Sequence, residues 1–422
     1  MKLSQLLKSI CLIVWGALMH APALSQSDQS CADLPRIEAV TAKGWCVGVV
    51  ADSKDGLRMP RHVVWLGQRN QNNSYLIDLL VVDMGSWEAG KGRLLHLTWS
   101  AATKKSSIKE IFSGLDRPHG LEKGPDGAFY LGEASKISRF TWKDNQASVL
   151  ETVLSNLPIE GRHPLKALVF GADGHLYFNV GAATDRCQGA GSKLLPLKKG
   201  LPHCTEMEGA QPQAAVYVAK MQWPQAKLIR VEPYATGLRN SMGLAAHPSG
   251  TLLQAENNID FPDEKFPPEE INVLLAGKHY GWPSCVGNRL PIPGAITADC
   301  KLTQAPALLM PAHAAPLHLA YTQKSFAAEK AKEGNRSTGL LVSWHGYRSA
   351  GQKIVRYDTN DRGIPQGPAQ ELISQWKVPA KQNTTHAGGA PVAWAQDQQG
   401  HLWIADDRNK MLVWFGRQNS QP

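Results

Sequence analysis

Polar side chains that could do chemistry recur just before and just after short apolar runs along this chain. The residues that precede the runs are Arg61-His62, His119, Arg162-His163 and Arg239-Asn240. The residues that follow them are Asp83, Glu133, Ala182, Asn257-Asn258, Trp344-His345 and Asp406-Asp407. A mixture of imidazole, guanidinium, amide and carboxylate groups suits a polar ligand, with or without a cation. The chemistry therefore depends on whether the fold brings these groups together.

The apolar runs belong to a repeated unit of two short strands joined by a polar turn. Four segments show it plainly: "HGLEKGPDGAFYLGEA", "ALVFGADGHLYFNVGA", "MGLAAHPSGTLLQAEN" and "VAWAQDQQGHLWIADD". Asp126-Gly127, Asp173-Gly174 and Ser249-Gly250 supply the positive backbone angles of tight hairpins. All-β repeats without an amphipathic helix are typical of propeller blades. We predict an all-β, six-bladed β-propeller, with a sandwich of two sheets as the alternative.

The propeller interpretation gives the polar residues a common place. The first strand of each blade lines a central channel, and pseudo-rotation carries equivalent repeat positions onto one ring. Residues before the first strands and after the second strands then gather at one mouth of the channel, where we predict a ligand site. The alternative is that a histidine such as His163 is structural and that the strand-end acids only cap turns.

The N-terminus has the pattern of a secretory signal peptide. Lys2 and Lys8 precede the apolar run from Cys11 to Leu18, and Ala23-Leu24-Ser25 places small residues at a cleavage site. We predict a signal peptide over 1–25, an N-terminal extension over 26–56 and the propeller over 57–422. The protein is then periplasmic or secreted and does not span a membrane after cleavage; an uncleaved anchor is the alternative.

The charge of the chain bears on its partners. The formal net charge of +9 falls to +7 when the signal, with its two lysines and no acid, is removed. The basic residues are scattered, which argues against nucleic acid and favours a small anionic ligand.

Six of the seven cysteines lie outside the signal and fall into three close pairs. In an oxidising compartment an even count indicates disulfides, and proximity favours the pairs Cys31–Cys46, Cys187–Cys204 and Cys285–Cys300. A metal site is the alternative, but no C-x-x-C spacing supports one.

The segment "GLRNSMGLAAHPSGTLLQAEN", followed by "PPEEINVLLAGKHYGWP", carries a more specific signal. It resembles the soluble quinoprotein sugar dehydrogenases, the glucose, aldose and sorbosone dehydrogenases that use pyrroloquinoline quinone (PQQ) and Ca²⁺ on a six-bladed propeller. The resemblance runs from about Leu57 to Phe415 and is most specific from Gly237 to Pro283. It implies a sugar-like substrate and oxidation by hydride transfer to PQQ.

The resemblance also implies roles for residues around the cofactor. His163 matches the general base that takes the proton of the anomeric hydroxyl while hydride passes to the quinone. Arg239 and Asn240 match a pair that contacts the cofactor, and Arg239 would stabilise charge on the quinone oxygen. Lys353, in "GQKIVRY", matches a lysine that contacts the quinone.

The same comparison implies two calcium sites. Asn258 and Ile259 fall where family members offer backbone carbonyls to the cofactor's Ca²⁺, and oxygen ligands suit such a hard cation. Glu270 and Tyr280 match a second, structural Ca²⁺ site. No C-x-x-C-H haem motif occurs, so the electrons must pass to an external acceptor.

The chain departs from the family pattern at positions that matter for this chemistry. The aspartate that orients the family's histidine falls on Ala182, and Asp185 is the nearest substitute. Two arginines that hold the cofactor's carboxylates fall on Ala390 and Val392. The cations available to replace them are Arg58, Arg61, Lys166 and Arg348.

Two other functions remain open on the residues alone. In a Ca²⁺-dependent lactonase on a similar propeller, a ring of four residues would hold one metal on the axis and activate water; these are Glu133, Asn179, Asn258 and Asp406. In a non-catalytic carbohydrate- or ligand-binding propeller, the same fold would carry no activity.

Overall fold

The computed structural model describes residues 30–189, 191–294, 299–322, 339–377, 388–420 and 422. Across these ranges the regular structure is almost entirely β, with two 3₁₀ turns, η1 (Thr205–Met207) and η2 (Cys300–Leu302), as the helical elements. The predicted all-β fold is confirmed. The predicted signal peptide lies outside the described residues. In the part that is described, no helix is long and apolar enough to cross a membrane.

Four antiparallel sheets of four strands follow one another along the chain. The first is β4 (Pro60–Gln71), β5 (Ser74–Asp83), β6 (Gly92–Ser100) and β7 (Lys105–Leu115). The second is β8 (Leu121–Lys123), β9 (Phe129–Gly132), β10 (Ile137–Phe140) and β13 (Glu151–Leu154). The third is β14 (Leu168–Phe170), β15 (Leu176–Val180), β18 (Ala215–Gln222) and β19 (Lys227–Thr236). The fourth is β20 (Ser241–Ala246), β21 (Leu252–Glu256), β22 (Glu269–Val273) and β25 (Leu308–Met310).

A larger sheet of ten strands contains the rest of the repeats. One part is β26 (Pro316–Tyr321), β27 (Leu340–Trp344), β28 (Lys353–Thr359) and β29 (Pro365–Lys377). The other part is β30 (Pro391–Gln396), β31 (Leu402–Asp406), β32 (Met411–Arg417) and β3 (Trp45–Ala51). The two parts are joined by β2 (Leu34–Thr41), which pairs with both β3 and β29 and also with β1 (Ser30–Cys31).

Three short hairpins project from the main sheets. They are β11 (Trp142–Lys143) with β12 (Gln146–Ala147), β16 (Leu194–Lys198) with β17 (Leu201–Cys204), and β23 (Cys285–Val286) with β24 (Leu290–Pro291).

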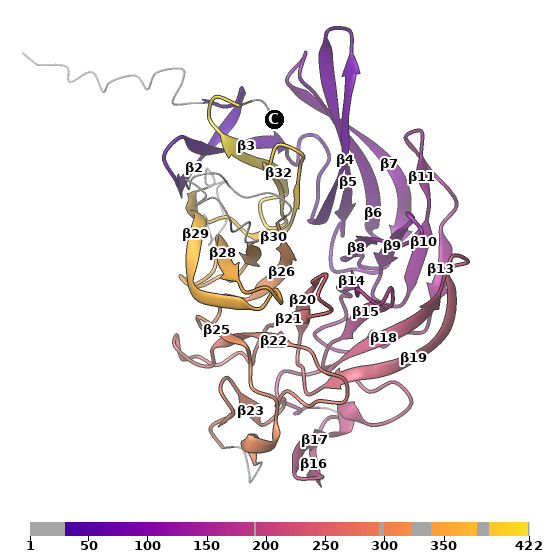
Figure 1. Ribbon diagram of the computed structural model, residues 1–422, viewed down its shortest axis with the longest axis vertical. Coiled ribbons are helices and arrows are strands. Elements are labelled where there is room, and N and C mark those ends of the chain that lie inside the picture. Colours follow the sequence, from indigo (N-terminus) through magenta and orange to yellow (C-terminus); the bar gives the residue numbers. More distant parts are fainter. Residues whose placement is uncertain (1–29, 190, 295–298, 323–338, 378–387, 421) are drawn as a thin grey trace, which may run out of the picture.

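The first strands of the repeats form a closed series of contacts. β4 contacts β8, which contacts β14, and the series continues through β20, β26 and β30 back to β4. Figure 1 shows the sheets following one another around the molecule in chain order, with β30 and β32 returning to the neighbourhood of β4. The polar residues at the starts of these first strands are thereby brought to a common region; Arg61 and His62, predicted to precede a strand, lie within β4.

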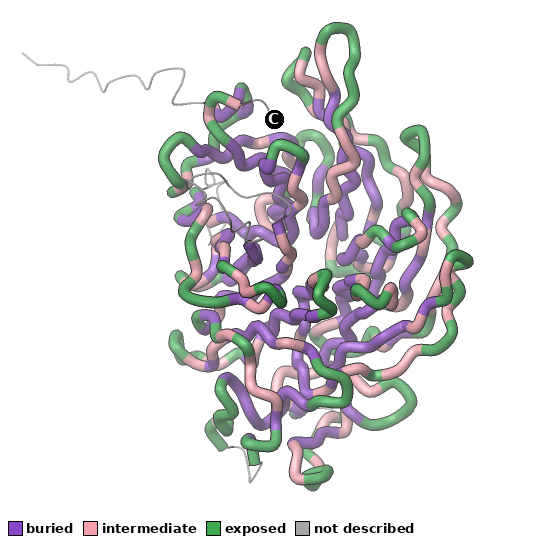
Figure 2. Tube along the Cα trace, in the orientation of Figure 1, coloured by how far each residue is buried: buried purple, intermediate pink, exposed green. Residues whose placement is uncertain are grey.

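The hairpin turns within the repeats follow the sequence prediction. Gly127, Gly174 and Gly250 lie between the first and second strands of three sheets, with φ of +78°, +76° and +90°. Glycine is favoured there because other residues are strained at positive φ. Figure 2 shows buried strands inside the molecule and more exposed chain at its periphery, where outer strands such as β7 and β19 lie.

The predicted N-terminal extension takes part in this sheet system. β3 pairs antiparallel with β32, so that Val47 lies opposite Phe415, and the Trp45 ring stacks on Phe415 with centroids 4.9 Å apart. One buried cluster also joins Trp99 of β6 to Trp403 and Trp414 of β31 and β32. The start and the end of the chain therefore close the arrangement by β pairing and by apolar packing.

All three predicted disulfides are confirmed. Cys31–Cys46, Cys187–Cys204 and Cys285–Cys300 are bonded, each over a short separation in sequence. Cys31–Cys46 ties β1 to β3, whereas the other two bridges fix segments with only short hairpins or 3₁₀ turns.

Candidate active site

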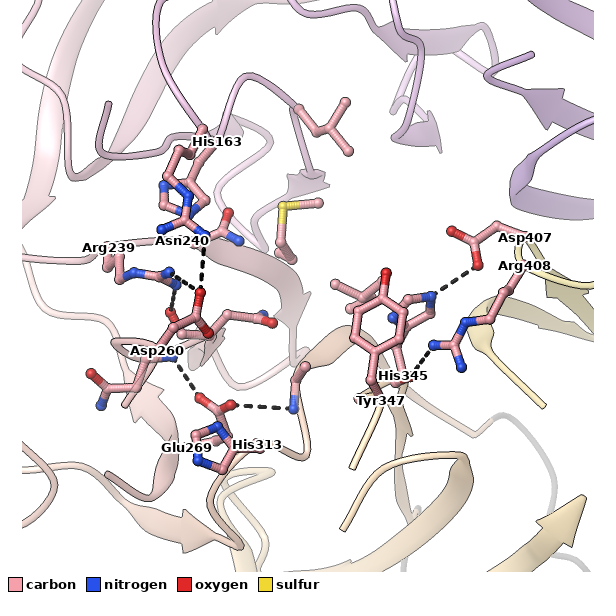
Figure 3. Close-up of a pocket in the computed structure, with 18 of the residues that line it drawn as sticks. His163, Arg239, Asn240, Asp260, Glu269, His313, His345, Tyr347, Asp407 and Arg408 are labelled. Carbon is pink, nitrogen blue, oxygen red and sulfur yellow. Dashed lines mark hydrogen bonds and ion pairs between the residues drawn. The ribbon is translucent and has the colours of Figure 1, made fainter. Parts of the chain in front are cut away.

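A cavity of about 500 Å³ lies where the polar residues that flank the repeat strands converge. The predicted residues that line it are Arg61, Arg162, His163, Arg239, Asn240, Asn257, Asn258, His345 and Asp407. Figure 3 shows His163, Arg239, Asn240 and Asp260 on one side, and His345, Tyr347, Asp407 and Arg408 on the other. The expectation that these groups gather at one place is correct for this set.

His163 is held by the backbone of the neighbouring strand end. Its Nδ1 lies 2.6 Å from the carbonyl oxygen of Ala182, so Nδ1 carries the proton and donates to that carbonyl. The Nε2 atom then keeps its lone pair. Burial, followed by the charge of Arg239, lowers the pKa of His163 to about 3 despite the opposing effect of the Ala182 carbonyl. His163 is therefore neutral near pH 7 and able to accept a proton at Nε2.

Two glycines allow the backbone to approach closely enough for this contact. A Cβ on Gly181 would lie 2.5 Å from the His163 Cβ, and one on Gly161 would lie 2.2 Å from the Ala183 carbonyl oxygen. The Arg162 amide donates to the same Ala183 oxygen at 2.8 Å. These contacts place the Arg162-His163 pair against the end of β15 at the cavity.

Asp185 does not orient the histidine, contrary to our expectation that it could substitute for the family aspartate. Its Oδ1 atom lies 2.7 Å from Nη2 of Arg239 and accepts the Asp260 amide at 3.1 Å. The Ala182 carbonyl performs the orienting contact instead. A backbone group can do this because only an acceptor for Nδ1–H is required.

Arg239 is almost fully buried, at 3% exposure, and is fixed on several sides. Nη1 donates to the Asn257 carbonyl at 2.9 Å, and Nη2 contacts Asp185 and Asp260. Its Nε is buried and has no hydrogen-bond partner among the described residues. The Oδ1 atom of the neighbouring Asn240 is also buried and has no hydrogen-bond partner among the described residues. A donor and an acceptor at the cavity thus remain for a ligand, because such groups are normally satisfied when buried.

The opposite side of the cavity centres on Asp407. This carboxylate pairs with Arg61 and accepts from His345 Nε2 at 2.9 Å. Burial alone would raise its pKa, but the charges of His345 and Arg61 outweigh burial and hold the pKa well below its usual value. Asp407 is therefore ionised and neutralises part of the cationic lining.

The four residues predicted to bind Ca²⁺ have different surroundings, and only Asn258 both lines the cavity and contacts another of the four, Glu270. Asn258 lines the cavity, and its side chain donates to Glu270 at 3.1 Å. The Ile259 side chain is buried beside Trp282, and its carbonyl accepts the Phe261 amide at 3.1 Å. The Tyr280 hydroxyl donates to the Val273 carbonyl at 2.6 Å and accepts the Leu275 amide.

Three buried glutamates surround this region, of which sequence reasoning identified only Glu270. Burial is the main cause that raises the pKa of Glu256 to about 7 and those of Glu269 and Glu270 to about 8. Glu269 lines the cavity and accepts the Asn258 amide at 2.5 Å. No repeat pattern pointed to Glu269, because it starts the third strand of its sheet.

Lys353 and the substitute cations have distinct environments. Lys353 forms an ion pair with Glu371 and does not line the cavity. Lys166 is fully buried and donates to the Pro158 and Pro164 carbonyls. Of the four substitute cations, Arg61 and Arg348 line the cavity, whereas Arg58 and Lys166 do not.

The positions of the missing family arginines lie in apolar surroundings. Ala390 and Val392 are fully buried. Val392 packs in an apolar cluster with Leu165, Met242 and Leu317, and these three side chains line the cavity. That wall supplies apolar contact rather than charge.

The acids and amides proposed to ring a metal in a lactonase instead cap backbone groups. Glu133 accepts the Asp116 amide at 2.9 Å, Asn179 accepts the Ala167 amide at 2.6 Å, and Asp406 accepts the Ala390 amide at 3.1 Å. None of the three lines the cavity. The alternative interpretation, that strand-end acids cap turns, accounts for these residues.

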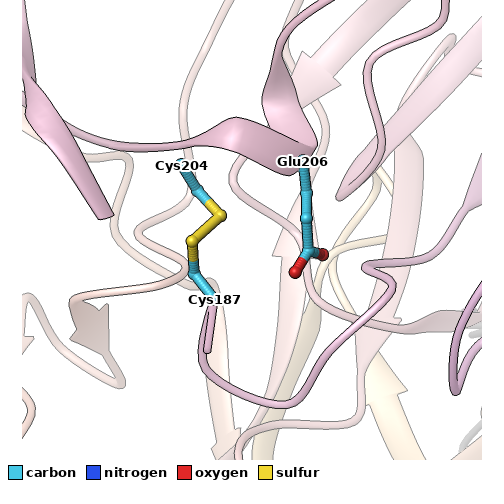
Figure 4. Close-up of side chains that lie close together, drawn as sticks. All are labelled: Cys187, Cys204 and Glu206. Atoms are coloured by element: carbon cyan, nitrogen blue, oxygen red, sulfur yellow. A yellow bond between two sulfur atoms is a disulfide. The ribbon is translucent and has the colours of Figure 1, made fainter. Parts of the chain in front are cut away.

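Among the described residues, one group of three His, Cys, Asp or Glu side chains lies close enough together to hold a metal ion: Cys187, Cys204 and Glu206 (Figure 4). The two cysteines are joined in a disulfide and offer no thiolate. Glu206 accepts the Ala183 amide at 2.6 Å and the Thr184 hydroxyl at 2.5 Å. The cluster is therefore a structural support for the loop beside His163.

Sequence reasoning missed several residues that line the cavity. Asp260, His313, Tyr347 and Arg408 all lie in connecting segments between strands. Their side chains follow no strand periodicity, so the repeat pattern gave no signal for them. Arg408 directly follows the predicted Asp406-Asp407 pair, and that adjacency is the one hint that the sequence offered.

Comparison with solved structures shows first what the fold is similar to. Solved structures of sugar dehydrogenases share the fold. The holo form of the pyranose dehydrogenase PQQ domain from Coprinopsis cinerea matches with a TM-score of 0.63 and 18% identity, over 91% of this chain and 98% of that one. The PQQ-bound aldose sugar dehydrogenase from Streptomyces coelicolor matches with a TM-score of 0.51 and 16% identity, over 89% of this chain and 99% of that one.

The sequence comparisons are more specific. Residues 130–327 match the model of the Glucose / Sorbosone dehydrogenase family. Quinoprotein glucose dehydrogenase B from Acinetobacter calcoaceticus is 29% identical over 211 residues, which are 47% of this chain and 41% of that protein. The chain thus matches about two fifths of the length of this curated relative. The predicted resemblance to the sugar dehydrogenases, a family of oxidoreductases, is confirmed.

Proposed function

We propose that this chain is an exported, PQQ-dependent dehydrogenase that oxidises a sugar or related alcohol on a six-bladed β-propeller. Four sheets of four strands, two further runs of four within the large sheet and the closed series of first strands support six blades. Three disulfides support an oxidising compartment, periplasmic or extracellular.

One observation carries the proposed chemistry. A neutral histidine with a free Nε2 shares a cavity with a buried guanidinium and an amide that both keep unpartnered polar atoms. These donor and acceptor groups, with several arginines around them, fit a polar polyanion such as PQQ. When bound, PQQ would accept the hydride from the substrate carbon.

The chain's own residues would divide the remaining work. His163 Nε2 would take the hydroxyl proton of the substrate, and the Ala182 carbonyl would keep Nδ1–H in place during the transfer. Arg239 and Asn240 would position the cofactor, and the guanidinium would stabilise developing negative charge. The apolar wall of Leu165, Met242 and Leu317 would limit the access of water. The electrons would leave to an external acceptor.

Calcium is part of the proposal. The carbonyls of Asn258 and Ile259 would hold the cofactor's Ca²⁺, and Glu270 and Tyr280 would contribute to a second ion. Supporting this, buried glutamates with raised pKa values gather beside Asn258. A contact between Lys353 and the quinone stays a prediction of the resemblance, because Lys353 pairs with Glu371 and does not line the cavity.

The test is reconstitution. Purified chain should bind PQQ in the presence of Ca²⁺, read by absorbance, and reduce a dye with at least one sugar in a panel. Chelation should lower the melting temperature, since a ligand of the native state stabilises it. A chain that binds no PQQ and reduces no dye, while binding a sugar or hydrolysing a lactone, would replace this function by one of the two alternatives.

A further inference from the structure

Arg408 differs from the other arginines that line the cavity. Four of them form ion pairs: Arg61 with Asp407, Arg162 with Asp260, Arg239 with Asp185 and Asp260, and Arg348 with Glu264. Among the described residues Arg408 forms none within 4.0 Å. Its nearest acid in sequence, Asp407, is already engaged by Arg61 and His345.

The Arg408 guanidinium is nonetheless held in a defined place. It follows β31 in the turn to β32, and its Cζ lies 4.1 Å from the centroid of the Tyr347 ring. Nη2 donates to the His345 carbonyl at 3.3 Å. A guanidinium packed on an aromatic face keeps a fixed plane, so its N–H groups point in fixed directions.

Two nitrogens of this guanidinium have no partner. Nε and Nη1 are buried and make no hydrogen bond to any residue that the structure describes. A buried cationic donor without an acceptor is costly, which indicates that an acceptor is present in the working state. Figure 3 shows Arg408 and Tyr347 across the cavity from His163 and Arg239.

We propose that Arg408, positioned by Tyr347, binds a carboxylate of the ligand that occupies this cavity. The proposal rests on the proposed function, because a sugar dehydrogenase with PQQ offers two sources of carboxylate. One source is the cofactor, whose acidic groups meet no cation at Ala390 or Val392 here. The other is a uronic acid, a sugar oxidised at C6. Both present the planar anion that a guanidinium recognises.

The test compares Arg408→Ala with wild type and with Arg417→Ala. Arg417 is a matched control, since its guanidinium also lies over an aromatic ring, that of Trp45 at 5.5 Å, but outside the cavity. Binding of PQQ with Ca²⁺ is measured by calorimetry, and glucuronate and glucose are compared as substrates of the reconstituted enzyme. Melting temperatures confirm that both variants fold.

If Arg408 holds the cofactor, Arg408→Ala weakens PQQ binding at least about tenfold and Arg417→Ala does not. If Arg408 holds the substrate, PQQ binding is kept while KM for glucuronate rises at least about tenfold and KM for glucose does not. Tyr347→Ala should give a smaller loss in the same measurement. A folded Arg408→Ala that binds PQQ and glucuronate like wild type overturns the inference and leaves the proposed function intact. A wild-type chain that binds neither overturns both.

Discussion

At the scale of single residues, the contact between His163 and the Ala182 carbonyl decides which nitrogen can act as a base. A carbonyl oxygen accepts a hydrogen bond from Nδ1–H and carries no full charge, so it fixes the tautomer without strongly raising the pKa of the ring. Ala182 stands where the resemblance places an orienting aspartate, and its backbone carbonyl still makes the orienting contact. The absence of the aspartate removes only the negative charge that would favour the protonated histidine.

We predict that His163→Gln lowers the turnover of sugar by at least about 10²-fold and leaves PQQ binding near the wild-type value. Glutamine retains a donor for the Ala182 carbonyl but cannot take a proton. Turnover is measured by dye reduction and folding by the melting temperature. Wild-type turnover in a folded variant would remove the catalytic role from His163.

The pKa of His163 gives a second prediction at this scale. In the chain without ligand, its ring should stay neutral from pH 8 down to pH 5, because the pKa is lowered to about 3. Arg162→Ala removes one of the positive charges that lower the pKa, so the variant should titrate at a higher pH. NMR of the histidine ring protons measures both. A wild-type titration near pH 6.5 would show that burial does not control this ring.

At the scale of elements, the strand-end acids serve as supports for the loops that carry the site. Four of them accept a backbone amide from the segment that precedes the first strand of their own sheet: Asp83, Glu133, Glu256 and Asp406. The repeat thus contains its own capping device. This explains why acids recur at that position without forming a metal ring.

We predict that Glu133→Ala lowers the free energy of unfolding by about 1–3 kcal/mol, because the partly buried Asp116 amide loses its acceptor. Glu151→Ala, in the same sheet, is the control: Glu151 makes an exposed ion pair with Arg139 and should change stability little. Urea unfolding measures both variants. Loss of Ca²⁺ binding in folded Glu133→Ala would instead revive the metal-ring hypothesis.

The disulfide Cys187–Cys204 fixes the loop that carries Asp185, the partner of Arg239. Replacing both cysteines by serine should cost about 3 kcal/mol of stability through the entropy of the unfolded chain. The variant should also bind PQQ more weakly than wild type. The matched pair Cys31–Cys46 closes a loop of similar length, and no residue of that loop lines the cavity. Its removal should destabilise the chain to a similar extent without weakening PQQ binding, and equal effects on binding would refute the link to Arg239.

The sequence predicted the elements better than the details of the site. Asp-Gly turns and alternating strands are local signals, so the hairpins at Gly127 and Gly174 could be predicted from the sequence. Repeat symmetry also brought His163 and Arg239 to one region. Partners such as Asp185 for Arg239 depend on the path of irregular loops, which no period describes. Arg408 was missed for the same reason.

At the scale of the whole molecule, closing the series of first strands buries imidazoles that are far apart in sequence. His62 on β4 and His318 on β26 meet edge to face, with ring centroids 5.3 Å apart. His119 accepts from Arg61 Nε at 3.2 Å through its Nδ1 and is therefore neutral. These rings lie behind the cavity lining and join sheets from both halves of the chain.

Burial lowers the pKa of His62 to about 4, and burial with the charge of Arg61 lowers that of His119 well below its usual value. The unfolded chain binds these protons below about pH 6.5, whereas the native state does not. The stability that the neutral rings contribute is therefore complete above pH 6.5 and is lost as the pH falls toward 4. Protonation would place cations among the first strands of several sheets that contact one another, so acid should open the whole molecule rather than one loop.

We predict that the free energy of unfolding of His62→Gln depends less steeply on pH than that of wild type between pH 6.5 and 4. Removing one such proton should reduce the slope by about 1.4 kcal/mol per pH unit. The slopes of the two proteins must be compared because the buried glutamates, whose pKa values are raised, make the free energy of unfolding fall as the pH rises, which is opposite to the effect of the histidines. Val63→Ala is the control: it also removes buried contacts on β4 but carries no proton, so it should lower stability at every pH and leave the slope unchanged. Equal slopes in wild type and His62→Gln would show that His62 becomes protonated within the folded molecule. The packing of the first strands would then not keep the positive charge of a protonated His62 out of the interior.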